Sequence, residues 1–243
     1  MKRICSVCVR AGSKGVPGKN LRILHGLPLL AHSVRQAVSS GLFDAIAVSS
    51  DSQEMLDVAR RHGATYLVRR PPELATDQAA KLPAVQHCVM MTERSQGLVF
   101  DTCVDLDATS PLRDIEDIQA VVQLLEESGA GNVITGMPAR RSPYFNMIEQ
   151  GQNGEIQLVK PTSPPLVRRQ DAPPCFDMNA SIYAWTREAL MAKKELFNPD
   201  TRLHVMPEDR SIDVDSEVDF LLVELLLKRK LNGIKLPLKE ARE

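Results

Sequence analysis

The stretch RAGSKGVPGKN, residues 10–20, directly follows the short apolar run ICSVCV at residues 4–9. The run is rich in β-formers and predicts a buried strand, and the loop after it holds three glycines, three cations and a proline. In α/β folds, ligands bind beyond the carboxyl ends of the strands, so the loop after the first strand is where a site is expected. The composition of this loop therefore raises the question of what it holds.

Outside the loop, short apolar stretches alternate with helical patterns. The expected strands are residues 3–9, 45–49, 64–68, 102–107, 132–137 and 180–185, and the expected helices are residues 27–40, 53–63, 79–93, 115–125 and 216–230. Strands that are apolar throughout are typical of a parallel sheet with helices on both faces. The sequence therefore predicts a doubly wound, mostly parallel α/β fold that forms a single domain over residues 1–243.

The alternation breaks between residues 138 and 176, which contain seven prolines. A disordered linker is one reading of this segment. However, two half-apolar runs, NMIEQ and EIQLVK, flank the turn signal GQNG at residues 151–154 and predict a hairpin. An ordered arm inserted into the domain is therefore the favoured interpretation.

Charge and composition limit the function classes. The 243 residues carry a formal net charge of -1, so no global positive field attracts nucleic acid or an anionic membrane. No apolar run approaches the roughly 20 residues that span a bilayer, and the N-terminus does not resemble a signal peptide. We expect a cytoplasmic protein without nucleic-acid or membrane partners.

Cys5 and Cys8 form a C-x-x-C pattern among five cysteines. A redox or zinc site is one interpretation, but these residues lie within an expected strand and no second C-x-x-C exists. Residues three apart in a strand point to opposite faces. We expect both cysteines to be small core residues.

The loop at residues 10–20 fits neither common phosphate-binding pattern. The spacing of Gly12, Gly15 and Gly18 matches neither the Walker motif nor G-x-G-x-x-G. Its glycines would still let backbone amides face an anion, and Arg10, Lys14 and Lys19 would supply positive charge, as a triphosphate site requires. The alternative is an ordinary solvated turn.

The stretch SIDVDSEVDF, residues 211–220, places Asp213 and Asp215 two residues apart, so in an extended segment both carboxylates lie on one face. Mg²⁺ binds through one or two carboxylates together with nucleotide phosphates. The alternative is that Asp215 or Ser216 only caps the final helix. A triphosphate loop in the same chain favours the metal interpretation.

Five segments together resemble the N-acylneuraminate cytidylyltransferases: RAGSKGVPGKN, RRPPELATD at 69–77, TSPLR at 109–113, NASIY at 179–183 and SIDVDSEVD at 211–219. The resemblance implies a Rossmann-like nucleotidyltransferase fold. It also implies that CTP and an acidic 2-keto sugar give a CMP-sugar and pyrophosphate, with Mg²⁺ as cofactor. In relatives the proline-rich arm crosses to the neighbouring subunit, so the resemblance implies a homodimer.

The resemblance also implies roles for individual residues. Residues implied to bind CTP are Arg10, Gly12, Ser13, Lys14, Lys19, Asn20 and Arg70, and Asp213 and Asp215 would hold the metal. Residues implied to border or shape the sugar site are Asp107, Ser110, Arg113, Asn179, Tyr183 and Phe197, together with Arg169 of the arm. Arg10, Lys19, Asp213 and Asp215 would carry the catalysis. A general base is not evident, and Asp215 is one candidate.

Two positions depart from the family pattern. Relatives often have Gln where this chain has Asp107, and Gly where it has Ala180. Both positions border the sugar pocket, so legionaminate or another nonulosonate is an alternative to N-acetylneuraminate, and keto-deoxyoctulosonate is a less favoured one. A buried carboxylate needs a donor, so we expect a basic or donor partner for Asp107, and Arg113 is one candidate. A nucleotide-dependent oxidoreductase and a non-catalytic nucleotide-binding protein remain alternatives from other classes.

Overall fold

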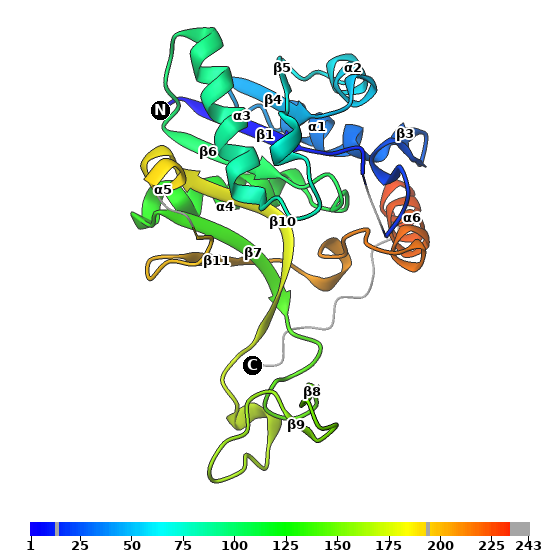
Figure 1. Ribbon diagram of the computed structural model, residues 1–243, viewed down its shortest axis with the longest axis vertical. Helices are drawn as coiled ribbons and strands as arrows, with labels where there is room; N and C mark the ends of the chain where they lie inside the picture. The colour runs from blue at the N-terminus through cyan, green and yellow to red at the C-terminus, as the bar shows by residue number, and fades with distance from the viewer. Residues whose placement is uncertain (13–14, 193–194, 234–243) are drawn as a thin grey trace.

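The computed structural model describes residues 1–12, 15–192 and 195–233, and the side chain of Arg169 is outside the description. A seven-stranded sheet forms its centre, in the order β11-β7-β10-β6-β1-β4-β5 (Figure 1). The strands are β1 Arg3–Cys8, β4 Ala45–Ser50, β5 Tyr66–Arg69, β6 Thr102–Leu106, β7 Asn132–Pro138, β10 Phe176–Thr186 and β11 Arg202–Val205. Only β10 runs against its neighbours, which confirms the predicted mostly parallel α/β sheet.

Helices cover both faces of the sheet because the strand side chains alternate. Ile4 of β1 packs on one face and Cys5 on the other. The helices α1 Leu29–Ser40, α2 Gln53–Arg61 and α4 Ile115–Ser128 cover the face of Cys5, and α3 Lys81–Gln96 and α5 Arg187–Ala192 cover the face of Ile4. The last helix, α6 Glu217–Leu231, packs with Val16 and Leu112 in a separate apolar cluster.

The cysteines follow the expectation from strand geometry. Cys5 is fully buried on the α1 face, and the partly buried Cys8 packs on the α3 face. Burial raises the pKa of the Cys5 thiol well above its ordinary value. All five cysteines are free thiols. The C-x-x-C pattern is therefore part of the core, as predicted.

The chain leaves the sheet at the end of β7 and returns at the start of β10, where Pro138 pairs with Phe176 (Figure 1). Between them lie the hairpin of β8 Ile148–Gln150 and β9 Ile156–Leu158, which confirms the predicted turn, and a 3-10 turn, η3 Arg169–Asp171. Short elements that the sequence patterns missed are β11, α5, the hairpin β2 Ile23–Leu24 and β3 Leu27–Pro28, and the 3-10 turns η1 Lys19–Leu21, η2 Pro72–Leu74 and η4 Glu208–Arg210. Among the described residues, no helix has the length and apolarity that crossing a membrane requires.

Candidate active site

The loop after β1 and the segment before α6 lie against each other, although they are about two hundred residues apart in the sequence. A Cβ atom added to Gly15 would lie 2.2 Å from the backbone carbonyl oxygen of Asp215. Only glycine permits this approach of two backbones. Val16 and Val214 are fully buried beside them, so the contact is part of the core cluster under α6.

Lys19 links the same two segments electrostatically. Its Nζ donates to the carbonyl oxygen of Val214 at 2.6 Å and lies 3.0 Å from Asp215 Oδ1. At the other end of the loop, the guanidinium of Arg10 pairs with Asp77 at 2.6 Å. The structure thus brings Arg10, Lys19 and Asp215, three of the predicted catalytic residues, to the edge where β1 ends.

The remaining predicted residues of the loop differ in what the structure shows. The Nδ2 of Asn20 donates to the carbonyl oxygen of Arg10 at 3.1 Å, while its buried Oδ1 has no hydrogen-bond partner among the described residues. A Cβ atom on Gly12 would meet nothing within 4 Å, so its backbone faces open space. Ser13 and Lys14 lie outside the described residues.

Asp213 and Asp215 form an acidic pair, in which Asp215 has Lys19 as its cationic partner. Burial and the neighbouring Asp215 carboxylate raise the pKa of Asp213 to about 6, and the side chain of Asp215 is 73% exposed. A divalent cation would relieve this repulsion, and two carboxylates match what Mg²⁺ takes from a protein when phosphates complete its shell. The described residues contain no cluster of three or more metal-ligating side chains. The pair therefore fits a cation that is shared with a phosphorylated ligand.

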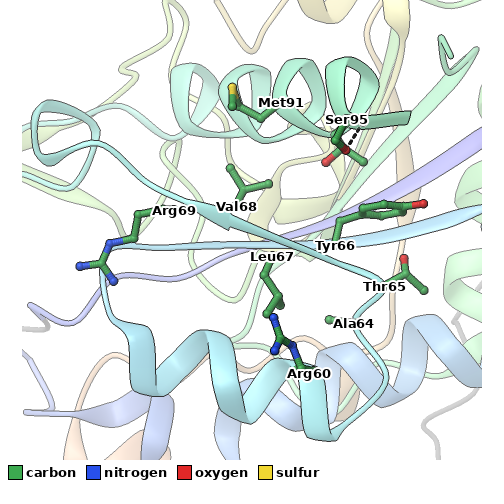
Figure 2. A pocket seen from close by; sticks show the side chains of 10 residues that line it. Arg60, Ala64, Thr65, Tyr66, Leu67, Val68, Arg69, Met91 and Ser95 are labelled. Atoms are coloured by element: carbon green, nitrogen blue, oxygen red, sulfur yellow. Dashed lines mark hydrogen bonds between the residues drawn. The ribbon is translucent and has the colours of Figure 1, made fainter. Parts of the chain in front are cut away.

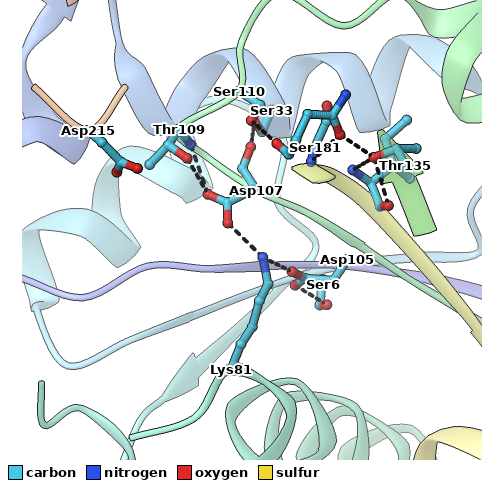
Figure 3. A network of polar contacts seen from close by, with 12 residues as sticks. Ser6, Ser33, Lys81, Asp105, Asp107, Thr109, Ser110, Thr135, Ser181 and Asp215 are labelled. Atoms are coloured by element: carbon cyan, nitrogen blue, oxygen red, sulfur yellow. Dashed lines mark hydrogen bonds and ion pairs between the residues drawn. The ribbon is translucent and has the colours of Figure 1, made fainter. Parts of the chain in front are cut away.

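Asp107 lies where β6 ends, and its carboxylate is held from two sides (Figure 3). The backbone N–H and the hydroxyl of Thr109 donate to Oδ1 at 3.0 and 2.9 Å, and Lys81 Nζ donates to Oδ2 at 2.6 Å. Burial alone would raise the pKa of Asp107, but Lys81 and Thr109 outweigh it and hold the pKa well below its usual range. The expected basic partner therefore exists, but it is Lys81 and not Arg113.

Ser110 and Arg113 lie behind the site and not in it. Arg113 is 1% exposed, and its donors go to Ser181, Ser33, Gln36 and the backbone carbonyl of Asp107. Ser110 is fully buried. Their polar atoms bond to other interior groups, so within this chain they can shape the pocket only from behind it. They fix the loop that carries Asp107.

The predicted sugar residues of β10 are also interior. The amide of Asn179 is buried and hydrogen-bonds to Thr135, Ser181, Ser211 and the Met206 sulfur. Tyr183 is 4% exposed and its ring lies 4.4 Å from Lys81 Nζ. The ring therefore packs against Lys81 and supports its position at the site.

Within this chain, Phe197 lies at the opposite ends of the strands from the glycine loop. It is 63% exposed, and the adjacent Leu196 carbonyl accepts from Asn132 at the start of β7. The start of β7 lies at the edge where β1 and β6 begin, opposite the glycine loop. Arg169 lies in the arm on η3, and its side chain is outside the described part of the chain.

A cavity of about 180 Å³ opens at the carboxyl ends of the strands, and Arg70, Arg10, Lys81 and Asp107 are among its lining residues. Arg70 is nearly buried and donates to the hydroxyl and carbonyl of Ser49. A second, larger cavity of about 480 Å³ lies along the edge strand β5, between residues of α2 and α3 such as Arg60 and Met91 (Figure 2). It contains none of the predicted site residues. A third cavity, of about 620 Å³, contains Arg70, whereas the first combines Arg10, Arg70 and Asp107 and is therefore the candidate active site.

Residues 4–212 match the family model described as Cytidylyltransferase. The chain belongs to the cytidylyltransferase family. It is therefore a nucleotidyltransferase, as the motifs predicted, and the oxidoreductase alternative is set aside.

Two relatives come from Campylobacter. The chain is 42% identical to the post-translational flagellin modification protein B of Campylobacter coli and 41% identical to the CMP-N,N'-diacetyllegionaminic acid synthase of Campylobacter jejuni, over 93% of this chain and 95% of each relative.

A solved structure has the same fold. A CMP:2-keto-3-deoxy-manno-octonic acid synthetase complexed with CTP superimposes with a TM-score of 0.68 at 14% sequence identity, covering 95% of this chain and all of that one. At this identity the likeness shows a shared Rossmann-like fold and no more. Lys81 is the site residue that sequence reasoning missed. The sequence offered only a lysine near the start of an expected helix and, separately, an aspartate at position 107.

Proposed function

We propose that this cytidylyltransferase transfers CMP from CTP to the anomeric hydroxyl of a nine-carbon 2-keto sugar acid and releases pyrophosphate. The observation that carries the proposal is the contact between the glycine loop and the carboxylate pair, made through Gly15 and Lys19. The two segments meet beyond the carboxyl end of β1, where nucleotides bind in this fold class. A loop for phosphates beside a carboxylate pair is what transfer from a nucleoside triphosphate requires.

The reaction forms a bond between the sugar oxygen and the α-phosphorus and breaks the bond from that phosphorus to the β-phosphate oxygen. The chain has to hold two anionic reactants in line and balance their charge. Arg10 and Lys19 are placed to contact phosphate oxygens from the two ends of the loop. Asp213 and Asp215 would hold Mg²⁺, which, when bound, would neutralise negative charge on the phosphates.

We propose a di-N-acylated nonulosonate of the legionaminate class as the sugar, in preference to a mono-N-acylated neuraminate. The name of the 41% identical relative supports this choice. Asp107 is compatible with it, because an ionised carboxylate can only accept hydrogen bonds and the second amide of such a sugar presents an N–H donor.

We further propose that the arm mediates a homodimer. Its hairpin side chains Ile148 and Ile156 are 61% and 58% exposed, and Val167 is 90% exposed. In Figure 1 the arm projects away from the sheet, so these side chains lie far from the domain's own core. Sedimentation of the purified protein tests this: a dimer is expected, and an active monomer contradicts it.

The test of the reaction is pyrophosphate release from CTP and MgCl₂ with a panel of 2-keto sugar acids. The panel contains N,N'-diacetyllegionaminate, N-acetylneuraminate and keto-deoxyoctulosonate. We expect CTP-dependent release with the nine-carbon sugars, the highest kcat/KM with the diacetylated one, and a CMP-sugar by mass spectrometry. CTP binding without pyrophosphate release from any sugar would make the chain a non-catalytic nucleotide-binding protein.

A further inference from the structure

Lys81, at the first turn of α3, bridges two carboxylates that β6 carries to its end (Figure 3). Its Nζ lies 2.6 Å from Asp107 Oδ2 and 3.0 Å from Asp105 Oδ2, and 4.4 Å from the centre of the Tyr183 ring. An ammonium group has three N–H donors. Two carboxylates and one aromatic face occupy the directions around this group.

The two carboxylates differ in what surrounds them. Asp105 is fully buried, and its Oδ1 accepts from Ser6 at 2.7 Å. Asp107 is 24% exposed at its side chain and lines the 180 Å³ cavity together with Lys81. Without the ammonium group, two carboxylates would share a mostly buried site, and one would be protonated because like charges cannot both ionise there.

The hydrogen bonds of Asp107 leave little free. Its Oδ1 already accepts two hydrogen bonds from Thr109, and Oδ2 accepts one from Lys81. A carboxylate oxygen has two lone pairs, so only one acceptor position, on Oδ2, remains for a ligand. A neutral glutamine, frequent in relatives, would need no ammonium partner and would also present an N–H donor.

We propose that Lys81 is a positioning residue: it keeps Asp107 ionised and fixed, so that Oδ2 offers one acceptor position to an N–H or O–H donor of the sugar. Lys81 and Asp107 act as one unit that determines sugar preference. This inference rests on the proposed function, because it assumes that the acceptor substrate enters the cavity beside Asp107.

A double-mutant cycle tests the unit. The variants are Lys81→Met, which keeps the apolar stem, Asp107→Gln, and the double variant, with KM and kcat measured separately for the sugar and for CTP. We expect each single variant to raise the KM for N,N'-diacetyllegionaminate at least tenfold and the KM for CTP less than threefold. Because both single variants disable the same unit, their effects should not multiply. We expect the sugar KM of the double variant to be at least tenfold lower than the product of the two single rises would give.

The matched control is Lys2→Met, which breaks a surface lysine–aspartate pair with Asp44 at the other end of β1. It should leave every kinetic constant within twofold. If Lys81→Met does not fold, Asp107→Gln is compared with the double variant. Once Asp107 is a glutamine, the further loss of Lys81 should change the sugar KM less than threefold. Three results would overturn the proposal. They are a further tenfold rise in the sugar KM from Asp107→Gln to the double variant, single effects on the sugar KM that multiply in the double variant, and an effect on the KM for CTP alone. No turnover by the wild type with any sugar would instead refute the proposed function.

Discussion

Two acidic regions lie at the same edge of the sheet, and the protein treats them differently. At Asp107 the interior supplies the compensation: Lys81 and Thr109 hold the carboxylate and keep its pKa low. At Asp213, burial and the neighbouring Asp215 carboxylate raise the pKa to about 6. In the first region Lys81 pairs with the carboxylate itself, whereas in the second Lys19 pairs with the exposed Asp215 and the two carboxylates still face each other. We therefore propose that Asp107 contributes to sugar selection and that the Asp213–Asp215 pair contributes to the chemistry.

Removing a carboxylate from the Asp213–Asp215 pair should have the largest effect. We expect Asp215→Asn to lower kcat by on the order of a hundredfold or more, because a metal-held transition state is worth several kcal/mol. The fold should persist, since Asp215 is exposed and sits outside the core. Pyrophosphate release and thermal unfolding, measured together, check both statements.

The control for this variant is Asp57→Asn on α2, where the carboxylate accepts from Gln53 far from the loop. It should retain full activity. Excess EDTA should abolish wild-type turnover and MgCl₂ should restore it. Undiminished activity of Asp215→Asn, or of the wild type in EDTA, would remove the distinction between the two acidic regions.

A methyl group on Gly15 should separate the loop from the carboxylate pair. Because an added Cβ would lie 2.2 Å from the carbonyl oxygen of Asp215, we expect Gly15→Ala to lower kcat/KM for CTP at least tenfold. Gly12→Ala, whose methyl would meet nothing within 4 Å, should cost less. Steady-state kinetics of both variants decide, and equal losses would show that backbone approach to Asp215 is not what Gly15 provides.

Much of the fold could be predicted because its long elements have strong periodicity. The helix at residues 115–125 and the buried strands at 45–49 and 102–107 correspond to α4, β4 and β6. The short β11 and α5 were missed because four to six residues carry too little pattern. The reversed direction of β10 leaves no trace in its composition.

The site could be predicted less completely, for a physical reason. The motifs identified Arg10, Lys19 and the Asp213–Asp215 pair because these residues belong to contiguous segments. They could not separate a residue that faces the cavity from one behind it, so they did not show that Arg113 and Asn179 are buried. Lys81 was missed since its contact with Asp107 depends on the order of strands, which places the start of α3 beside the end of β6.

Arg210 anchors the segment that carries the acidic pair, and its loss should be seen in stability. Its guanidinium bonds to both oxygens of Asp117 at 2.9 and 2.8 Å. We expect Arg210→Met to lower the free energy of unfolding by about 1–3 kcal/mol, because it leaves a buried carboxylate short of donors. The control is Arg168→Met, in an exposed pair with Asp171, which should change it by less than about 1 kcal/mol.

The same ion pair predicts a pH dependence. Burial would raise the pKa of Asp117, but His204, whose Nε2 lies 3.7 Å from Oδ1, and the hydrogen bonds from Arg210 outweigh it and lower the pKa to about 2, below the value of roughly 3.9 in an unfolded chain. Its stabilising contribution is therefore present above about pH 4 and is lost as the pH falls toward 2. Urea unfolding between pH 3 and 7 should show a steeper acid loss in the wild type than in Arg210→Met. Parallel curves would contradict this assignment.

The smallest expected effect lies at Ala180, beside the Asp107 region. Ala180 has φ 50°, in the left-handed region, at the irregularity of β10 between Met178 and Tyr183. This conformation costs a residue with a Cβ about 1 kcal/mol. Ala180→Gly relieves that strain but gives the unfolded chain more freedom and removes a methyl that packs on the core. We therefore expect a gain in unfolding free energy of no more than about 1 kcal/mol, with unchanged sugar preference.

The control is Ala184→Gly, in the same strand and fully buried, which should instead destabilise the protein by roughly 1 kcal/mol. If urea unfolding shows equal losses in both variants, strain at Ala180 is not what distinguishes this position.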